Sequence, residues 1–114
     1  MVSKKITICD WHYEKAEQTP VYFAGKGLSV ITSTWRTPAV AVAQTRDMVK
    51  FRRSARGSKG KRYLGIMQTV WSGTEPFLDQ YYAAKLTGQT EDKTPANCFI
   101  ALVNEMKKLN SADK

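Results

Sequence analysis

The stretch LSVITSTWRTP (Leu28–Pro38) contains the pattern that organises the whole sequence. It is a run rich in β-branched residues that ends in tryptophan, and a Thr-Pro pair follows two residues later. β-Branched residues favour strands, whereas proline fits the first turn of a helix, where its missing N–H costs nothing. The stretch therefore predicts a strand that ends at Trp35 and a helix that begins near Pro38.

Two further copies of this arrangement can be found in the chain. They are ITICDW (Ile6–Trp11), which leads to a Thr-Pro pair at 19–20, and YLGIMQTVW (Tyr63–Trp71), which leads to Thr-Glu-Pro at 74–76. A fourth Thr-Pro pair, at 94–95, opens a last helix that no strand precedes. Because a threonine hydroxyl can accept an unpaired backbone N–H of the first turn, we expect these threonines to cap their helices.

Apolar residues recur at helical spacing behind these starting points. The predicted helices are a short one that stops at Gly27, one from Pro38 to about Arg53, one from Pro76 to Leu86 and one from Pro95 to Asn110. Strands that alternate with helices require right-handed crossovers and pair in parallel. The predicted fold class is therefore α/β, with three parallel strands alternating with helices plus a C-terminal helix. With 114 residues and 42% hydrophobic content, residues 1–114 should form a single domain.

The positive charge of the chain is concentrated in one segment. The formal net charge is +8, and the segment Arg46–Arg62 holds eight basic residues against one acidic residue, a net charge of +7. Clustered lysines and arginines bind phosphates through counterion release, so nucleic acid is a candidate partner. We favour a different interpretation, in which these bases complement the dipole of the preceding helix and residues 54–62 form a solvated basic loop.

Several function classes have no support in the sequence. No apolar run approaches the roughly 20 residues of a membrane helix and no secretory signal is visible, so we expect no membrane partner and, by default, a cytoplasmic location. Cys9 and Cys98 lie in apolar stretches and are expected to be reduced core residues. Cys9 and His12 are too few ligands for zinc, and RGSKGK at 56–61 lacks the P-loop spacing. We therefore expect neither a metal nor a cofactor.

The three tryptophans that end the strands form the candidate binding site. Because the strands are parallel, their carboxyl ends all lie at the same end of the sheet. Trp11, Trp35 and Trp71 should therefore lie together there. The polar residues beside them are Asp10, His12, Gln68 and Ser72. Aromatic faces next to hydrogen-bonding groups suit a pyranose ring, which has an apolar C–H face and a rim of hydroxyls. A carbohydrate is therefore the expected ligand.

Plainer interpretations of the same residues stay open. Tryptophan buries a large area whatever the ligand, so the three indoles could instead close the end of the core. Asp10 and His12 are two residues apart and fall on one face of an extended strand, where an acid beside a histidine can support general acid/base chemistry. We favour a surface pair for these two residues, and we assign no catalytic residue.

The strand-end residues resemble those of a known enzyme family. Ile6–Trp11, Leu28–Trp35 and Leu64–Trp71 are similar to strands six, seven and eight of the (β/α)8 barrel in β-N-acetylhexosaminidase-like (family 20) glycoside hydrolases. The resemblance covers roughly residues 6–82, and its most specific part is GIMQTVWSG (Gly65–Gly73). It implies that the chain corresponds to the last third of such a barrel and that Trp71 forms a wall of a sugar pocket.

The chain departs from that family in two respects. The family usually has an acid two residues after the last tryptophan, where this chain has Gly73. The catalytic Asp-Glu pair of the family lies on an earlier strand, and nothing before Ile6 corresponds to it. The resemblance therefore implies a hydrolase-like module that is catalytically incomplete alone.

Two expected functions follow from these observations. The first is a glycoside-hydrolase-like barrel fragment whose strand-end face binds sugar, for example an N-acetylhexosamine-containing glycan. Three parallel strands leave two open edges, so this fragment should belong to a longer polypeptide or form a homo-oligomer. The alternative is a small basic module that binds nucleic acid or another polyanion through Arg46–Arg62. A structural protein without a ligand is the third hypothesis.

Overall fold

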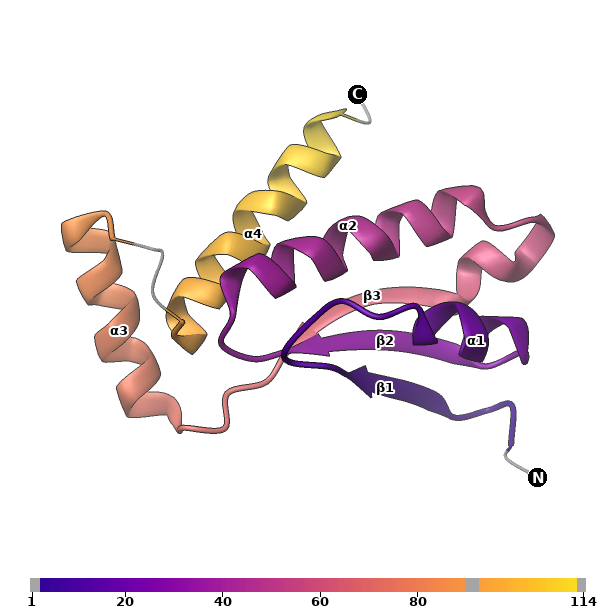
Figure 1. The fold of residues 1–114 in the computed structure, drawn as a ribbon, viewed down its shortest axis with the longest axis horizontal. Helices are drawn as coiled ribbons and strands as arrows, with labels where there is room; N and C mark the ends of the chain where they lie inside the picture. Colours follow the sequence, from indigo (N-terminus) through magenta and orange to yellow (C-terminus); the bar gives the residue numbers. More distant parts are fainter. Residues whose placement is uncertain (1–2, 90–92, 113–114) are drawn as a thin grey trace.

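The computed structural model describes residues 3–89 and 93–112 of the chain. The order of elements is β1 (Thr7–Trp11), α1 (Thr19–Gly25), β2 (Ser29–Thr34), α2 (Pro38–Ser54), a 3-10 helix η1 (Gly57–Arg62), β3 (Tyr63–Gln68), α3 (Thr74–Thr87) and α4 (Pro95–Ala112) (Figure 1). All four predicted helices are present. The third strand is shorter than predicted, because it ends at Gln68 and leaves Trp71 in the following loop.

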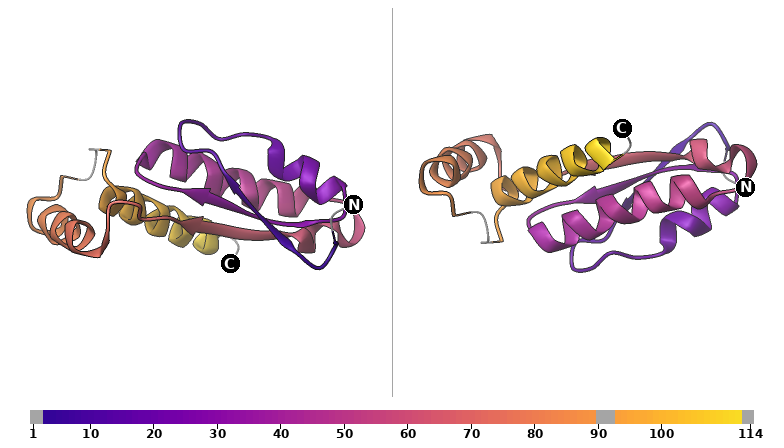
Figure 2. Two further views of the ribbon diagram at one scale, coloured as in Figure 1. Left: turned by 90° about the horizontal axis from the view of Figure 1, so that it is seen from below. Right: turned by 90° about the horizontal axis from the view of Figure 1, so that it is seen from above.

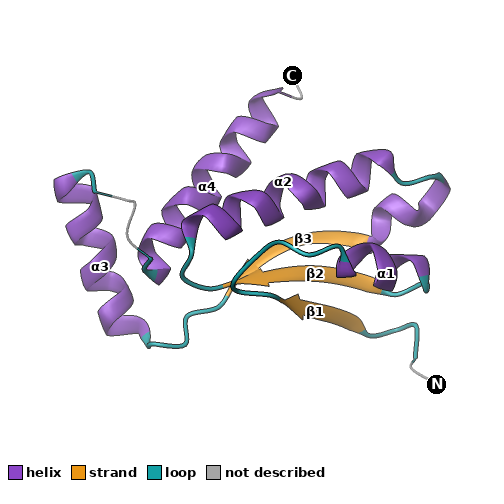
Figure 3. Cartoon of the chain, viewed as in Figure 1, coloured by secondary structure: helices purple, strands orange, loops and turns teal. Residues whose placement is uncertain are grey.

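The strands form one parallel, open sheet in the order β1-β2-β3, which confirms the predicted α/β fold class. All three strand arrows point the same way in Figure 3. Ile8 pairs with Val30 in the first ladder. In the second, the register shifts between Val30 and Ile31, and Gly65 lies opposite Ile31 with a φ of 139°. This positive φ favours glycine, which carries no Cβ, and explains the glycine inside a strand.

Three helices, α1, α2 and α4, pack on the same face of the sheet. Val30 lies in a core cluster with Met48 and Phe51 of α2, together with Ala24 and Tyr63. A second cluster joins α2 to α4, and its buried members are Ala41, Cys98 and Leu102. The views in Figure 2 show α2 and α4 side by side. The core therefore lies between the sheet and these helices, whereas α3 extends beyond the strand ends and packs mainly against α4 (Figure 1).

The opposite face of the sheet carries side chains that remain exposed. Cys9, Trp11 and Met67 belong to this face and are exposed, because side chains alternate between the two faces of a strand. The prediction that both cysteines lie in the core is correct for Cys98, which is buried, and wrong for Cys9, which is exposed on this second face. Both thiols are free, and burial raises the pKa of the Cys98 thiol.

The predicted threonine cap is present at one of the four helix starts. The hydroxyl of Thr94 accepts the backbone N–H of Asn97 at 3.1 Å. The residues that precede the other three helices make no side-chain capping hydrogen bond. Thr19 is the first residue of α1, and its hydroxyl donates to Asp10 Oδ2 at 2.5 Å. Gln18 and not Thr19 occupies the N-cap position of α1, so the threonine hydroxyl is not placed where a capping side chain accepts the N–H groups of the first turn.

An ion pair connects α2 with α4. Arg46 Nε lies 2.6 Å from Glu105 Oε1, and Glu105 is buried. The hydrogen bond from Arg46 lowers the pKa of Glu105 below its ordinary value of 4.5. Because the folded chain favours the ionised carboxylate, the pair stabilises the fold above that value, and this contribution is lost as the pH falls through the lowered pKa.

We therefore predict that Arg46→Ala destabilises the chain more at about pH 7 than at a strongly acidic pH, because the contribution of the ion pair is lost as the pH falls through the lowered pKa of Glu105. Urea unfolding at the two pH values, with Lys50→Ala on the same helix as the control, measures this difference. A loss of stability that is equal at both pH values would contradict the prediction.

In the described part of the chain, no helix is both long enough and apolar enough to span a membrane. The basic loop predicted at 54–62 begins with the last residue of α2, and most of it forms η1.

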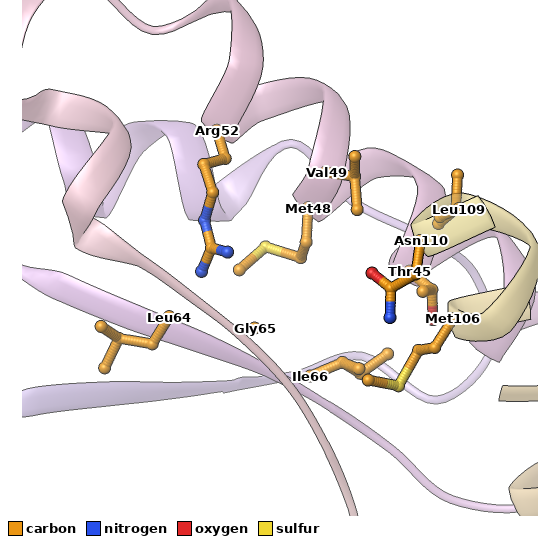
Figure 4. A pocket seen from close by; sticks show the side chains of 10 residues that line it. All are labelled: Thr45, Met48, Val49, Arg52, Leu64, Gly65, Ile66, Met106, Leu109 and Asn110. Carbon is orange, nitrogen blue, oxygen red and sulfur yellow. The ribbon is translucent and has the colours of Figure 1, made fainter. Parts of the chain in front are cut away.

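A hollow of about 190 Å³ lies between α2, β3 and α4 (Figure 4). Its apolar lining residues include Met48, Leu64, Ile66 and Met106. The hollow lies next to β3, which is the last strand of the sheet and whose outer edge pairs with no described strand. The molecule therefore leaves apolar surface uncovered on one edge of its sheet as well as on its open face.

Candidate functional site

The structure brings the three tryptophans together at the carboxyl ends of the strands. Trp11 ends β1, Trp35 directly follows β2, and Trp71 lies three residues after β3. Tyr13 connects all three: its ring centroid is 5.5 Å from that of Trp11 and 5.8 Å from that of Trp35. The indole N–H of Trp71 donates to the Tyr13 hydroxyl at 2.8 Å. We call these four residues the aromatic cluster.

Tyr13 is the member of the aromatic cluster that the sequence analysis missed. It follows Trp11 by two residues, so strand alternation places it on the same face if the extended conformation continues. That signal was present in the sequence.

The tryptophans differ in the surface that they offer. Trp11 is 64% exposed and Trp71 is 69% exposed. Trp35 is half-buried, with the guanidinium of Arg36 4.3 Å from its ring. Its indole nitrogen is buried and finds no hydrogen-bond partner among the residues that the structure describes. Trp11 and Trp71 therefore present accessible ring faces. Trp35 is less accessible, and its ring is contacted by Arg36 and Tyr13.

Asp10 supports the site from the covered side of the sheet. It is 7% exposed, and both of its oxygens are engaged: Oδ1 lies 3.1 Å from His12 Nε2, and Oδ2 accepts the Thr19 hydroxyl. Gln44 Nε2 donates to the backbone carbonyl of His12 at 2.7 Å. Asp10 is therefore a group that positions His12, whereas the half-exposed imidazole can reach a ligand.

An open hollow of about 370 Å³ lies at this end of β1. Trp11, His12 and Tyr13 line it together with Glu14, Lys15 and Glu17. Lys15 and Glu17 form an ion pair at 3.4 Å. The hollow therefore combines two aromatic rings, an imidazole and charged groups, which is a set that can both stack on a ligand and form hydrogen bonds with it.

Gln68 has a role within the fold. Its Nε2 donates to the backbone carbonyl of Trp35 at 2.9 Å and to that of Pro95 at 2.6 Å. These two bonds use both amide hydrogens and join the end of β3 to the loop after β2 and to the start of α4. Gln68 therefore has no free donor for a ligand, although it was a candidate site residue.

Three of the eight bases in the segment Arg46–Arg62 make hydrogen bonds within the fold. Arg46 pairs with Glu105, Arg52 donates to the backbone carbonyl of Tyr63, and Arg62 donates to that of Ala24 at 2.9 Å. The remaining members at positions 50, 53, 56, 59 and 61 are exposed. Part of the positive charge of the segment therefore holds the fold together.

No protein-family model matches the chain, and no curated protein matches it either. The functional interpretation therefore rests on the residues and their geometry.

Proposed function

We propose that this chain is the C-terminal part of a (β/α)8-barrel glycoside hydrolase of the β-N-acetylhexosaminidase-like (family 20) type, and that its strand-end face binds a sugar. The observation that carries the proposal is the aromatic cluster: three strand-end tryptophans, far apart in the sequence, meet around the hydroxyl-bearing ring of Tyr13. Accessible aromatic faces beside polar groups match the alternating apolar and hydroxyl surfaces of a pyranose.

The individual residues take different roles in this proposal. Trp11 and Trp71 stack against the sugar because their rings are exposed, and Trp35 supports Tyr13 from below. His12 and the Tyr13 hydroxyl form hydrogen bonds with the sugar hydroxyls. Asp10 holds the imidazole of His12 in place without contacting the ligand.

Hydrolysis is not part of the proposed activity of the chain alone. Glycosidases of most families require two carboxyl groups that flank the scissile bond. Asp10 is buried, and both of its oxygens are engaged by Thr19 and His12. Gly73 takes the place where the family has an acid after the last tryptophan. A catalytic pair would have to come from outside this chain.

The open sheet favours completion of the barrel by further strands. Parallel strands are usually covered on both faces, yet here Cys9, Trp11 and Met67 on the second face are exposed. The apolar hollow beside β3 lies where a neighbouring strand and helix of a barrel would pack (Figure 4). We propose that the rest of a longer polypeptide, or another copy of the chain, covers these surfaces.

The proposal predicts that Trp71→Ala weakens sugar binding by about fivefold, because one stacking face worth about 1 kcal/mol is lost. The measurement is a titration of the isotope-labelled chain with N,N′-diacetylchitobiose, followed by NMR at the three indole N–H resonances. We expect the resonances of Trp11 and Trp71 to shift more than that of Trp35.

The control variant is Tyr82→Ala, which removes an exposed aromatic ring on α3, outside the aromatic cluster. It should bind the disaccharide as the parent does. If the parent shows no shift at any indole resonance at millimolar sugar, or if the two variants lose binding equally, the proposed sugar site is wrong.

A further inference from the structure

The amino ends of the strands carry a second surface, at the opposite end of the sheet from the aromatic cluster. It is formed by the end of α1, by η1 and by the residues before β1. Side-chain hydrogen bonds connect these segments: the Arg62 guanidinium donates to the backbone carbonyl of Ala24 at 2.9 Å, and the Lys4 amine donates to that of Lys26. Three basic side chains from separate parts of the sequence therefore gather around the end of α1.

A hollow of about 240 Å³ lies between α1, the end of α2 and η1. Val21 of α1 lines one side, and Lys59 of η1 lines another, with Phe51 and Tyr63 among the other lining residues. Gly25, the residue before Lys26, also lines this hollow, so the end of α1 and Lys59 lie in the same region of the surface. We call Lys4, Lys26, Lys59, Arg62 and Tyr22 the basic face.

The charge of the basic face is not balanced by nearby acids in the sequence. From Gln18 to Thr74 the chain contains ten basic residues and a single acid, Asp47. Asp47 lies in the middle of α2 and not in α1 or η1. A surface with several cations and no acid from its own elements attracts phosphates by releasing their counterions.

An exposed aromatic ring lies within this basic surface. Tyr22 is 61% exposed, and the Lys26 amine lies 5.6 Å from the centroid of its ring. Phe23 contacts the Tyr22 ring edge to face at a centroid distance of 5.6 Å, which supports it from the side of the core. An aromatic face flanked by cations is the arrangement on which unpaired bases stack while their phosphates contact lysine and arginine.

We propose that the basic face binds single-stranded nucleic acid. The phosphates contact Lys26, Lys59 and Arg62, and one base stacks on Tyr22. A duplex fits less well, because its bases are already stacked and cannot reach Tyr22. This surface shares Lys59 and Arg62 with the segment Arg46–Arg62, but Lys4, Lys26 and Tyr22 lie outside that segment, and Arg46 is paired with Glu105.

The test uses fluorescence anisotropy of the full chain with a labelled oligothymidylate and a labelled oligouridylate of about 15 nucleotides, at several salt concentrations. We expect binding of one or both oligonucleotides. The logarithm of the binding constant should fall with the logarithm of the salt concentration with a slope of about −2 for three phosphate contacts. Lys26→Glu/Lys59→Glu should reduce the slope by about 1.4 and weaken binding by at least about tenfold. Tyr22→Ala should weaken binding by about 5- to 100-fold.

Two controls separate this proposal from general attraction to anions. Lys93→Glu/Lys107→Glu makes the same change in net charge at exposed positions away from the basic face, and should leave binding nearly unchanged. A heparin oligosaccharide should be insensitive to Tyr22→Ala, because it has no base to stack. The proposal is overturned if both double variants lose affinity equally, if Tyr22→Ala has no effect on the oligonucleotides, or if heparin or anionic vesicles bind while both oligonucleotides do not.

Discussion

Phe51→Ala is expected to lower the free energy of unfolding by about 3–5 kcal/mol, which is a large part of the stability of a small domain. Phe51 is buried in α2, and its ring lies 5.7 Å from that of Tyr63 in β3. It belongs to the core cluster that holds Val30 and Met48. The truncation leaves a cavity between α2 and the sheet. Urea denaturation, monitored by tryptophan fluorescence, measures the loss of unfolding free energy.

Leu86→Ala is the matched control for this core substitution. Leu86 is 88% exposed on α3, so its truncation should change the free energy of unfolding by less than about 0.5 kcal/mol. A similar loss for the two variants would show that the cluster around Val30 is not the core of the fold.

Gln68→Leu should destabilise the chain by about 2–4 kcal/mol, although leucine is similar in size. The substitution removes the donors for two backbone carbonyls, those of Trp35 and Pro95. An unsatisfied buried carbonyl costs about 1–3 kcal/mol, and the gain from burying leucine offsets part of this. Urea denaturation measures the change in stability. The NMR resonance of the Trp35 indole should also shift, because its loop loses its connection to β3.

Gln89→Leu provides the comparison for the glutamine substitution. Gln89 is exposed after α3, so this change should leave stability within about 0.5 kcal/mol of the parent. If Gln68→Leu is equally well tolerated, Gln68 does not hold the strand ends together, and its amide would again be a candidate for contacting a ligand.

Much of the fold could be predicted from local patterns. A proline that follows a tryptophan-terminated β-rich run indicates the start of a helix, and the helix from Pro38 ends within one residue of the prediction. The strand predicted to end at Trp35 ends one residue earlier, at Thr34. These features depend on residues close together in the sequence, through backbone preference and hydrophobic spacing.

The side-chain partners could not be predicted in the same way. Thr19 and Thr94 stand in equivalent Thr-Pro pairs, yet Thr94 caps α4 and Thr19 donates to Asp10. Gln68 was expected to face a ligand, but it donates to two backbone carbonyls from different elements. Each of these outcomes depends on which group another segment brings within hydrogen-bonding distance.

The sequence by itself determined the class of the fold and the end of the sheet at which the tryptophans lie, because strand alternation and parallel pairing leave few other arrangements. Only the tertiary structure decided which of the site residues are accessible. Packing of α1 and α2 against one face buries Asp10, while the open second face leaves Cys9 and Trp11 exposed. Tertiary packing also brings the end of α1 and Lys59 of η1 to one hollow, since residues distant in the chain meet only when the helices cover the sheet.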